Sequence, residues 1–348
     1  MKNISNYSSK IPSLFWAAAI LAAAGCSSDT SGTTSSTTTT GTTVTTAASS
    51  VYISNQTSGS GSQTPQILGL SATSSSSASA STVNGPASDT FIGVATDTSG
   101  NLYTVDKSGA NGSYTLNEYA AGTNTAGTTA STTLRTFTST AINLVPLGIK
   151  VDGSGNIYVM LTGGTVLRFA ATSSGAVAPS ATLTGAASAM ATDQNGDLYV
   201  TVPVSATDSH HAIAVYANGY ASASAPLRTI LPATEVYITS LAVDASGNIY
   251  ITGKDSNNNV QVAVFAAAAT GTSTATRIIS GASTDLVNPW QVQVDGSGNI
   301  FVGDSTTGAA GGTVMVYKFA STASGNVSPA LMTSTTATYA ATMGMAIH

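Results

Sequence analysis

The sequence predicts an all-β fold of repeated four-stranded units, and three observations lead to this prediction. First, the segment 151–158 (VDGSGNIY) returns in similar form four more times, and the repeats lie 41 to 55 residues apart. Second, each copy joins two alternating apolar runs through a short polar turn, which is the pattern of a β-hairpin. Third, an aromatic residue recurs at the expected start of each second strand: Tyr52, Tyr103, Tyr158, Tyr199, Tyr250 and Phe301. This period suits the blades of a six-bladed β-propeller.

The two ends of the repeat region complement each other. Five complete blades are expected to begin near residues 93, 148, 189, 240 and 291. Residues 51–85 provide only the second, third and fourth strands of a blade, while residues 343–348 (MGMAIH) resemble a first strand that stops before its turn. We therefore expect one C-terminal strand to join three N-terminal strands, which closes the ring and removes open sheet edges.

The repeated turn is expected to be structural. Its aspartate can accept hydrogen bonds from the N–H groups of the turn, and glycine can adopt the positive φ that a tight reversal needs. A calcium loop is the alternative, but a second carboxylate and a distal bidentate glutamate are missing from the motif. We therefore expect no metal at these turns, whose aspartates are Asp97, Asp152, Asp193, Asp244 and Asp295.

Composition limits the class of partner. Of the 348 residues, 42% are hydrophobic and only 7% are charged, with a formal net charge of -5. Such a chain lacks a basic surface to neutralise phosphates, so a nucleic-acid partner is not expected. We expect a monomer that carries no cofactor.

The N-terminal region has the features of an export signal. Lys2 and Lys10 precede an apolar run that is too short to cross a membrane as a mature helix. Small residues then lead to Cys26, the single cysteine, in a pattern that resembles a bacterial lipobox. This predicts a signal peptide over 1–25, a lipidated Cys26 that anchors the chain to the membrane, and a flexible Ser/Thr-rich tether over 26–50. The expected location is the outer membrane or the cell surface.

Segments 244–253 (DASGNIYITG) and 146–152 (PLGIKVD) resemble bacterial NHL-type and SBBP-type β-propeller repeat proteins, and the resemblance covers about residues 51–348. It implies a binding scaffold or, less often, an enzyme. Lactonase-like relatives hold a metal with acidic and amide side chains of the inner strands, where this chain offers Lys150, Gln291 and Gln293. Lyase-like relatives use histidine with a metal, and this chain has three histidines, two of them adjacent.

Charged and aromatic residues in the connecting loops mark a candidate binding face. These loops are expected on the propeller face opposite the repeated turns. Trp290 is the strongest candidate, because a rim tryptophan can stack on a sugar or a peptide, although packing over the core is the favoured interpretation of this residue. The candidate residues are Trp290, Tyr237, His210, His211, Asp106, Lys107, Lys254, Asp255 and Asp304.

Arginines recur on the expected fourth strands at positions 135, 228 and 277. On an outer strand an arginine is expected to cover apolar surface with its aliphatic stem.

These features favour a cell-envelope lipoprotein whose propeller binds or scaffolds an extracellular polysaccharide or protein, without catalysis. The alternative is a lactonase-like or lyase-like enzyme with its site at the channel mouth. A cluster of carboxylates or imidazoles around that mouth would favour the enzyme.

Lipidation can be tested directly on the mature protein. Mass spectrometry of its N-terminus should find a diacylated Cys26, and Cys26→Ala should release the protein from the membrane. Ser27→Ala is the matched control and should leave attachment unchanged. An unmodified terminus, or a membrane-bound Cys26→Ala variant, would contradict the prediction.

Overall fold

The alternating segments of the sequence form β-strands in the computed structural model. The structure describes residues 50–55, 66–71, 81–84, 90–108, 113–121, 133–186, 188–205, 210–305, 314–335 and 344–348. All of these belong to one compact unit, Thr46–His348. The predicted signal peptide, Cys26 and the predicted tether up to residue 49 lie outside the described residues. The first strand begins at Ser50, one residue earlier than expected.

Five four-stranded antiparallel blades are formed by consecutive stretches of the chain. The first has β4 (Thr90–Thr96), β5 (Leu102–Ser108), β6 (Ser113–Tyr119) and β7 (Thr133–Thr138). The second has β8 (Pro146–Val151), β9 (Ile157–Leu161), β10 (Thr165–Phe169) and β12 (Ala181–Thr184). The third has β13 (Met190–Thr192), β14 (Leu198–Pro203), β15 (His211–Tyr216) and β16 (Arg228–Pro232). The fourth has β17 (Val236–Val243), β18 (Ile249–Asp255), β19 (Val260–Phe265) and β21 (Arg277–Ser280). The fifth has β22 (Gln291–Val294), β23 (Ile300–Ser305), β24 (Val314–Phe319) and β25 (Ala330–Thr335).

A further sheet combines strands from the two ends of this unit. Its order is β26 (Met345–Ile347), β1 (Ser50–Asn55), β2 (Gln66–Ser71) and β3 (Ser81–Asn84). β26 runs antiparallel to β1, with Ala346 opposite Tyr52. The Gly344 amide donates a hydrogen bond to the Ser54 hydroxyl at 2.7 Å, which fixes the beginning of β26 against the end of β1.

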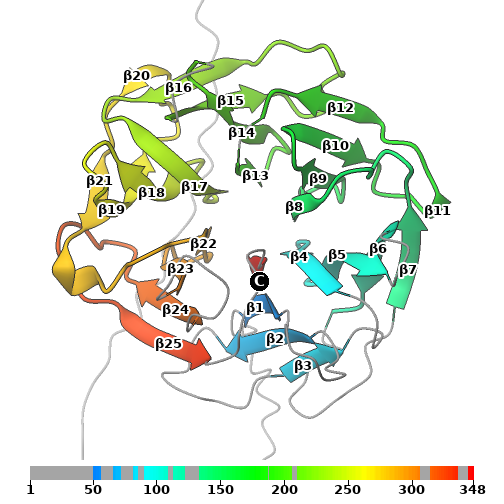
Figure 1. Cartoon of the computed structure of the whole chain (residues 1–348), viewed down its shortest axis with the longest axis horizontal. Helices are drawn as coiled ribbons and strands as arrows, with labels where there is room; N and C mark the ends of the chain where they lie inside the picture. Colours follow the sequence, from blue (N-terminus) through cyan, green and yellow to red (C-terminus); the bar gives the residue numbers. More distant parts are fainter. Residues whose placement is uncertain are drawn as a thin grey trace, which may run out of the picture. The chain divides into compact units, whose positions relative to one another are not determined.

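The blades are arranged around a central axis, with the first strand of each nearest to it (Figure 1). Along this inner ring β4 contacts β8, β8 contacts β13, β13 contacts β17, and β17 contacts β22. β26 contacts both β22 and β4. The described residues therefore form an all-β propeller, and no helix among them is long and apolar enough to cross a membrane. The short elements β11 (Gly175–Ala176), β20 (Gly271–Ser273) and the 3-10 turn η1 (Ala282–Thr284) lie in connections.

The core lies between neighbouring sheets. One cluster packs β4–β7 residues such as Leu116 and Phe137 against Ile149 and Phe169 of the second blade. The Phe137 and Phe169 rings meet edge to face at 5.4 Å. Complete burial of such side chains contributes about 1.5–3 kcal/mol each. The aromatic residues at the ends of the third strands are all buried: Tyr119, Phe169, Tyr216, Phe265 and Phe319.

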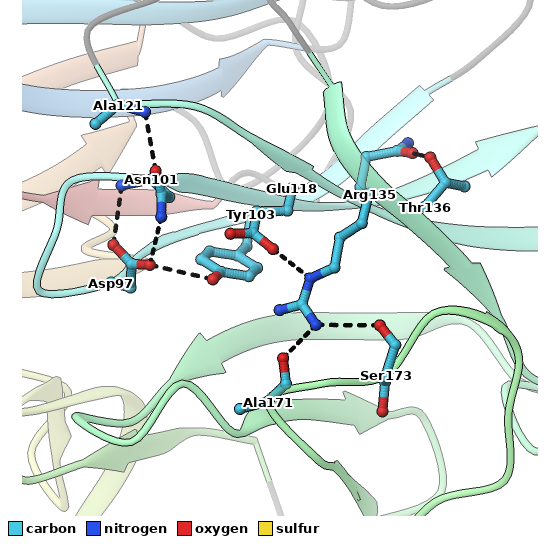
Figure 2. A network of polar contacts seen from close by, with 10 residues as sticks. Asp97, Asn101, Tyr103, Glu118, Ala121, Arg135, Thr136, Ala171 and Ser173 are labelled. Atoms are coloured by element: carbon cyan, nitrogen blue, oxygen red, sulfur yellow. Dashed lines mark hydrogen bonds and ion pairs between the residues drawn. The ribbon is translucent and has the colours of Figure 1, made fainter.

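Three outer strands are tied to the following blade by arginine. Arg135 of β7 donates to the Ser173 carbonyl at 3.1 Å and to the Ala171 carbonyl, and it pairs with Glu118 (Figure 2). Arg228 of β16 donates to the Ala267 carbonyl at 2.6 Å. Arg277 of β21 donates to the Ser321 and Ala323 carbonyls. The arginines therefore do more than cover apolar surface, because each guanidinium connects two blades.

A parallel backbone contact accompanies each of these arginines. β7 pairs in parallel with β11, and β16 pairs in parallel with β20. On β21, Ile279 forms a parallel bridge with Gly325. In each case the partner segment belongs to the loop whose carbonyls accept from the arginine. We refer to the arginine and its parallel contact together as the inter-blade latch.

The inter-blade latch predicts that replacing Arg277 destabilises the protein more than replacing Arg168. Arg277→Met should lower the free energy of unfolding by about 1–3 kcal/mol, because a guanidinium that donates to two carbonyls is lost. Arg168 of β10 is the matched control, since its Nε atom is buried without a hydrogen-bond partner among the described residues. Arg168→Met should cost less than half as much in denaturant-induced unfolding. Equal losses for both variants would argue against the latch.

Candidate functional site

A cavity of about 410 Å³ lies where the inner strands end in the repeated turns. It is lined by the ends of β4, β8, β13, β17, β22 and β26 and by the first residues of the turns that follow. We refer to it as the axial mouth. A much smaller cavity of about 40 Å³ lies among the beginnings of the inner strands. The larger of these two cavities therefore lies on the face of the repeated turns. The sequence had predicted a binding site on the opposite face.

Each repeated aspartate is held by its own hairpin. The Asp152 Oδ1 atom accepts from the amides of Ser154 and Asn156, both at 2.9 Å. Its Oδ2 atom accepts from the Asn156 side-chain amide at 2.9 Å and from the Tyr158 hydroxyl at 3.0 Å. Gly155 adopts a φ of +78°, which permits the reversal. Asp97 and Asp244 have the same four kinds of donor. Figure 2 shows the bonds from Asn101 and Tyr103 to Asp97.

These bonds engage the carboxylates with their own turns and second strands, and all five aspartates also line the axial mouth. The tyrosines remain donors, since burial and the bond to Asp244 raise the pKa of Tyr250 to about 12. Asp193 lacks the side-chain amide donor because Asp197 replaces the asparagine, and Asp295 lacks the phenol because Phe301 replaces the tyrosine. Among the described residues, no group of three or more His, Cys, Asp or Glu side chains is arranged to hold a metal ion.

Polar side chains at the axial mouth also join the inner strands to one another. The Thr96 hydroxyl donates to the Ile347 carbonyl at 2.8 Å, and the Gln293 side-chain amide donates to the Met345 carbonyl at 2.9 Å. Thr192 donates to the Val151 carbonyl at 3.3 Å. These groups join neighbouring inner strands around the mouth, whose wall also contains the five turn aspartates.

Lys150 differs from these neighbours. It lies on β8 and lines both the axial mouth and the smaller cavity, so it marks the boundary between them. Its ammonium has no hydrogen bond or ion pair with any of the described residues. Burial lowers the pKa of Lys150 to about 8, with no contribution from a neighbouring charge. The sequence already distinguished Lys150, because it is the one charged residue within the predicted inner strands.

The candidate residues of the opposite face form separate groups. His211 is buried, and its Nδ1 atom accepts from the Ile238 amide at 3.1 Å. Its ring lies 5.0 Å from that of the half-exposed Tyr237. His210 instead faces Glu235, with 3.6 Å between Nδ1 and Oε2. The two histidines therefore diverge, as adjacent residues at the start of a strand are expected to do.

A second group gathers around Asp304. This buried carboxylate accepts from the amides of Val287, Asn288 and Ser305 at 2.6 to 2.7 Å. Burial raises the pKa of Asp304, while these bonds and the charge of Lys254 oppose the increase. The Lys254 ammonium lies 3.4 Å from the Asn288 side-chain oxygen. Asp304 therefore folds the connection between β21 and β22 back onto the sheet.

Trp290 is partly buried and packs against the core in the same region. It lies against a cluster that contains Phe301 and Met345. A Cβ atom on Gly303 would come within 2.5 Å of the Trp290 ring, so the missing side chain at Gly303 makes room for the indole. This geometry favours the core interpretation of Trp290 over the stacking platform.

The remaining candidates lie apart from these groups. Asp106 is buried on β5 and accepts from the Asn117 side-chain amide at 2.6 Å, while Lys107 is exposed. Asp255 repeats the aspartate turn on the other face: its Oδ1 atom accepts from the Asn257 and Asn259 amides. Asn258 adopts the positive φ that glycine has elsewhere. The spacing of Asp255 and Asn259 equals that of Asp152 and Asn156, and this sequence signal identifies Asp255 as a turn residue.

Comparison with known families supports the repeat architecture. Residues 231–260 match the β-propeller repeat family SBBP. The chain contains an SBBP-type propeller repeat. No curated protein sequence matches it significantly.

Similar solved structures include the WD40 domain of Toxoplasma gondii coronin, at 11% identity and a TM-score of 0.46. That match covers 83% of this chain and 68% of the other. Chaetomium thermophilum Raptor matches at 11% identity and a TM-score of 0.44, over 73% of this chain and 22% of the other.

Proposed function

We propose that this chain is an exported, lipid-anchored propeller that binds an extracellular ligand at the axial mouth. The observation that carries the proposal is the mouth itself: a cavity of about 410 Å³ whose rim is fixed by side-chain bonds between inner strands. A pocket of this volume, largely formed before binding, is what a small ligand or the end of a polymer requires. Its wall of aspartate, threonine, glutamine and backbone atoms suits the hydroxyl groups of a polysaccharide or the amides of a peptide.

The cellular part of the proposal rests on the N-terminal sequence. An acylated Cys26 would hold the protein at the outer membrane or cell surface of a bacterium. A flexible tether of about 24 residues has a root-mean-square span of about 25–30 Å. The propeller would then reach an extracellular polysaccharide or protein without leaving the membrane.

We also propose that the blades form a closed ring of six. The pairing of β26 with β1 supports this, because it completes a four-stranded sheet from the two ends of the unit. The contacts of β26 with β22 and β4 support it as well. In such a ring Ile347 and His348 are part of the wall of the axial mouth, so ring closure and ligand binding depend on the same strand.

A lactonase-like or lyase-like enzyme is the second candidate. The observation that favours it is Lys150, whose lowered pKa leaves part of the amine unprotonated near neutral pH. A neutral amine in a cavity can act as a base or a nucleophile.

Ring closure is testable by deletion. Removal of residues 344–348 takes away β26, including the buried Met345, and exposes the edge of β1. We expect unfolding or aggregation, since an open central edge invites intermolecular pairing. Deletion of residues 27–45 is the control and should leave the melting temperature unchanged. An unchanged melting temperature after the C-terminal deletion would contradict closure by β26.

Binding at the axial mouth is testable by blocking it. Gly296 lines the mouth, and a Cβ atom there would meet no atom within 4 Å, so Gly296→Trp places an indole in the opening without backbone strain. On an array of bacterial envelope oligosaccharides, the variant should bind at least about tenfold more weakly than the wild type. Ser297→Trp adds the same group to the same turn outside the lining and should bind normally. Equal binding by both variants would place the site elsewhere, and an array without a binder would remove polysaccharides as the partner class.

A further inference from the structure

The junction between the second and third blades lacks the inter-blade latch. The latch connects the first blade to the second, the third to the fourth and the fourth to the fifth. β12, the fourth strand of the second blade, carries no arginine. Among the described residues it also has no parallel neighbour, because its sheet ends with β12. Both parts of the latch are therefore missing at this junction.

The strand register shows which residues replace the arginine. In the third and fourth blades the latch arginines lie opposite Val215 and Val264 of the third strands. The equivalent pair in the second blade is Arg168 of the third strand and Ala181 of the fourth. The arginine is thus on the other strand of the pair, and an alanine occupies the latch position.

The loop that would receive a latch arginine also differs. In the fifth blade the Ala323 amide closes a turn with the carbonyl three residues earlier, and the Ala323 carbonyl accepts from Arg277. In the third blade the Tyr220 amide closes the same turn. Tyr220 is buried, and it belongs to the apolar cluster that contains Ala181. A tyrosine of the third blade therefore packs where the other junctions have an arginine of the preceding blade.

Two buried polar atoms at this junction have no hydrogen-bond partner among the described residues. They are the Nε atom of Arg168 and the hydroxyl oxygen of Tyr220. A buried donor without a partner has lost its hydrogen bonds to water without replacement, which disfavours the closed arrangement. Separation of the two blades would give water access to both groups. The same two groups therefore favour an opening of this junction.

Apolar packing does not distinguish this junction from the others. A buried apolar cluster lies at each of the four junctions between the first and fifth blades. Polar contacts across the second junction include the bond from the Thr182 amide to the Ser222 hydroxyl at 3.0 Å. The Thr192 hydroxyl donates to the Val151 carbonyl at 3.3 Å. Neither contact involves a charged donor, which makes them weaker than the guanidinium bonds of the latch.

We propose that the ring opens locally between the second and third blades before the junctions that carry the latch. Each blade keeps its own strands in this opening, and the apolar cluster around Tyr220 becomes accessible to solvent. β8 and β13 both line the axial mouth, so the opening reaches the mouth between Asp152 and Asp193. The inference goes beyond the proposed binding function and does not depend on it, since it rests on contacts between blades.

Two alanines offer matched probes of this opening. Ala214 and Ala263 occupy the same register position on the third strands of the third and fourth blades, and both are buried. Ala214 packs in the cluster between the second and third blades. Ala263 packs in the cluster between the third and fourth blades. A buried thiol reacts only when its surroundings open, so the labelling rate of a cysteine at each position measures the opening of one junction.

The experiment treats mature Ala214→Cys and Ala263→Cys variants with iodoacetamide under native conditions and follows each site by mass spectrometry. We expect Ala214→Cys to react at least about tenfold faster than Ala263→Cys, because only its junction lacks the latch. Arg228→Met removes the latch between the third and fourth blades. In the Ala263→Cys protein it should raise the labelling rate at least about tenfold.

The latch can also be rebuilt at the second junction. Arg168→Val, Ala181→Arg and Tyr220→Ala together introduce the residue types found between the fourth and fifth blades. This triple variant should slow the labelling of Ala214→Cys to about the rate of Ala263→Cys. Equal rates of the two single-cysteine proteins, or faster labelling of Ala263→Cys, would overturn the inference. So would a folded triple variant with an unchanged rate. If the triple variant does not fold, the two single-cysteine rates and the effect of Arg228→Met decide.

Discussion

The propeller depends on one repeated interaction, the aspartate carboxylate that closes the turn after the inner strands β4, β8, β13, β17 and β22. In its complete form it accepts two amides of the turn, one side-chain amide and the phenol of the second strand. The bonds continue outward in the third blade, where Tyr199 contacts Asp193 at 3.3 Å and accepts from Arg228 at 3.2 Å. Arg228 then reaches the next blade. A single carboxylate near the axis is thereby connected to the perimeter, in a chain with few other charges.

Individual members of this network are replaced in some blades. In the fifth blade Phe301 replaces the tyrosine, and Lys318 lies 5.3 Å over its ring. In the second blade the arginine is Arg168, which lies on the third strand and not on the fourth. It is paired with Tyr158 of the second strand. Neighbouring blades still share buried apolar clusters, and the hydrophobic contacts maintain the fold where a polar link is missing.

The distribution of charge separates structure from function. The turn aspartates, Asp255 and Asp304 accept hydrogen bonds from the backbone, so their carboxylates hold turns and loops in place. Trp290 fills space over Gly303. Lys150 takes part in none of these interactions and lines both axial cavities.

The sequence by itself determined the strands, the turns and the blade period, because these follow from local alternation and from hydrogen bonds within five or six residues. It also contained the Asp255 to Asn259 spacing that identifies one candidate as a turn residue. The surroundings of Asp304 and Trp290 were decided by the tertiary structure, since their partners come from a loop that folds back over the sheet. The axial mouth depends even more on the tertiary structure, because its wall is formed by six segments between residues 95 and 348. Whether Lys150 had a partner there depended on how all six strands converge, which no local pattern encodes.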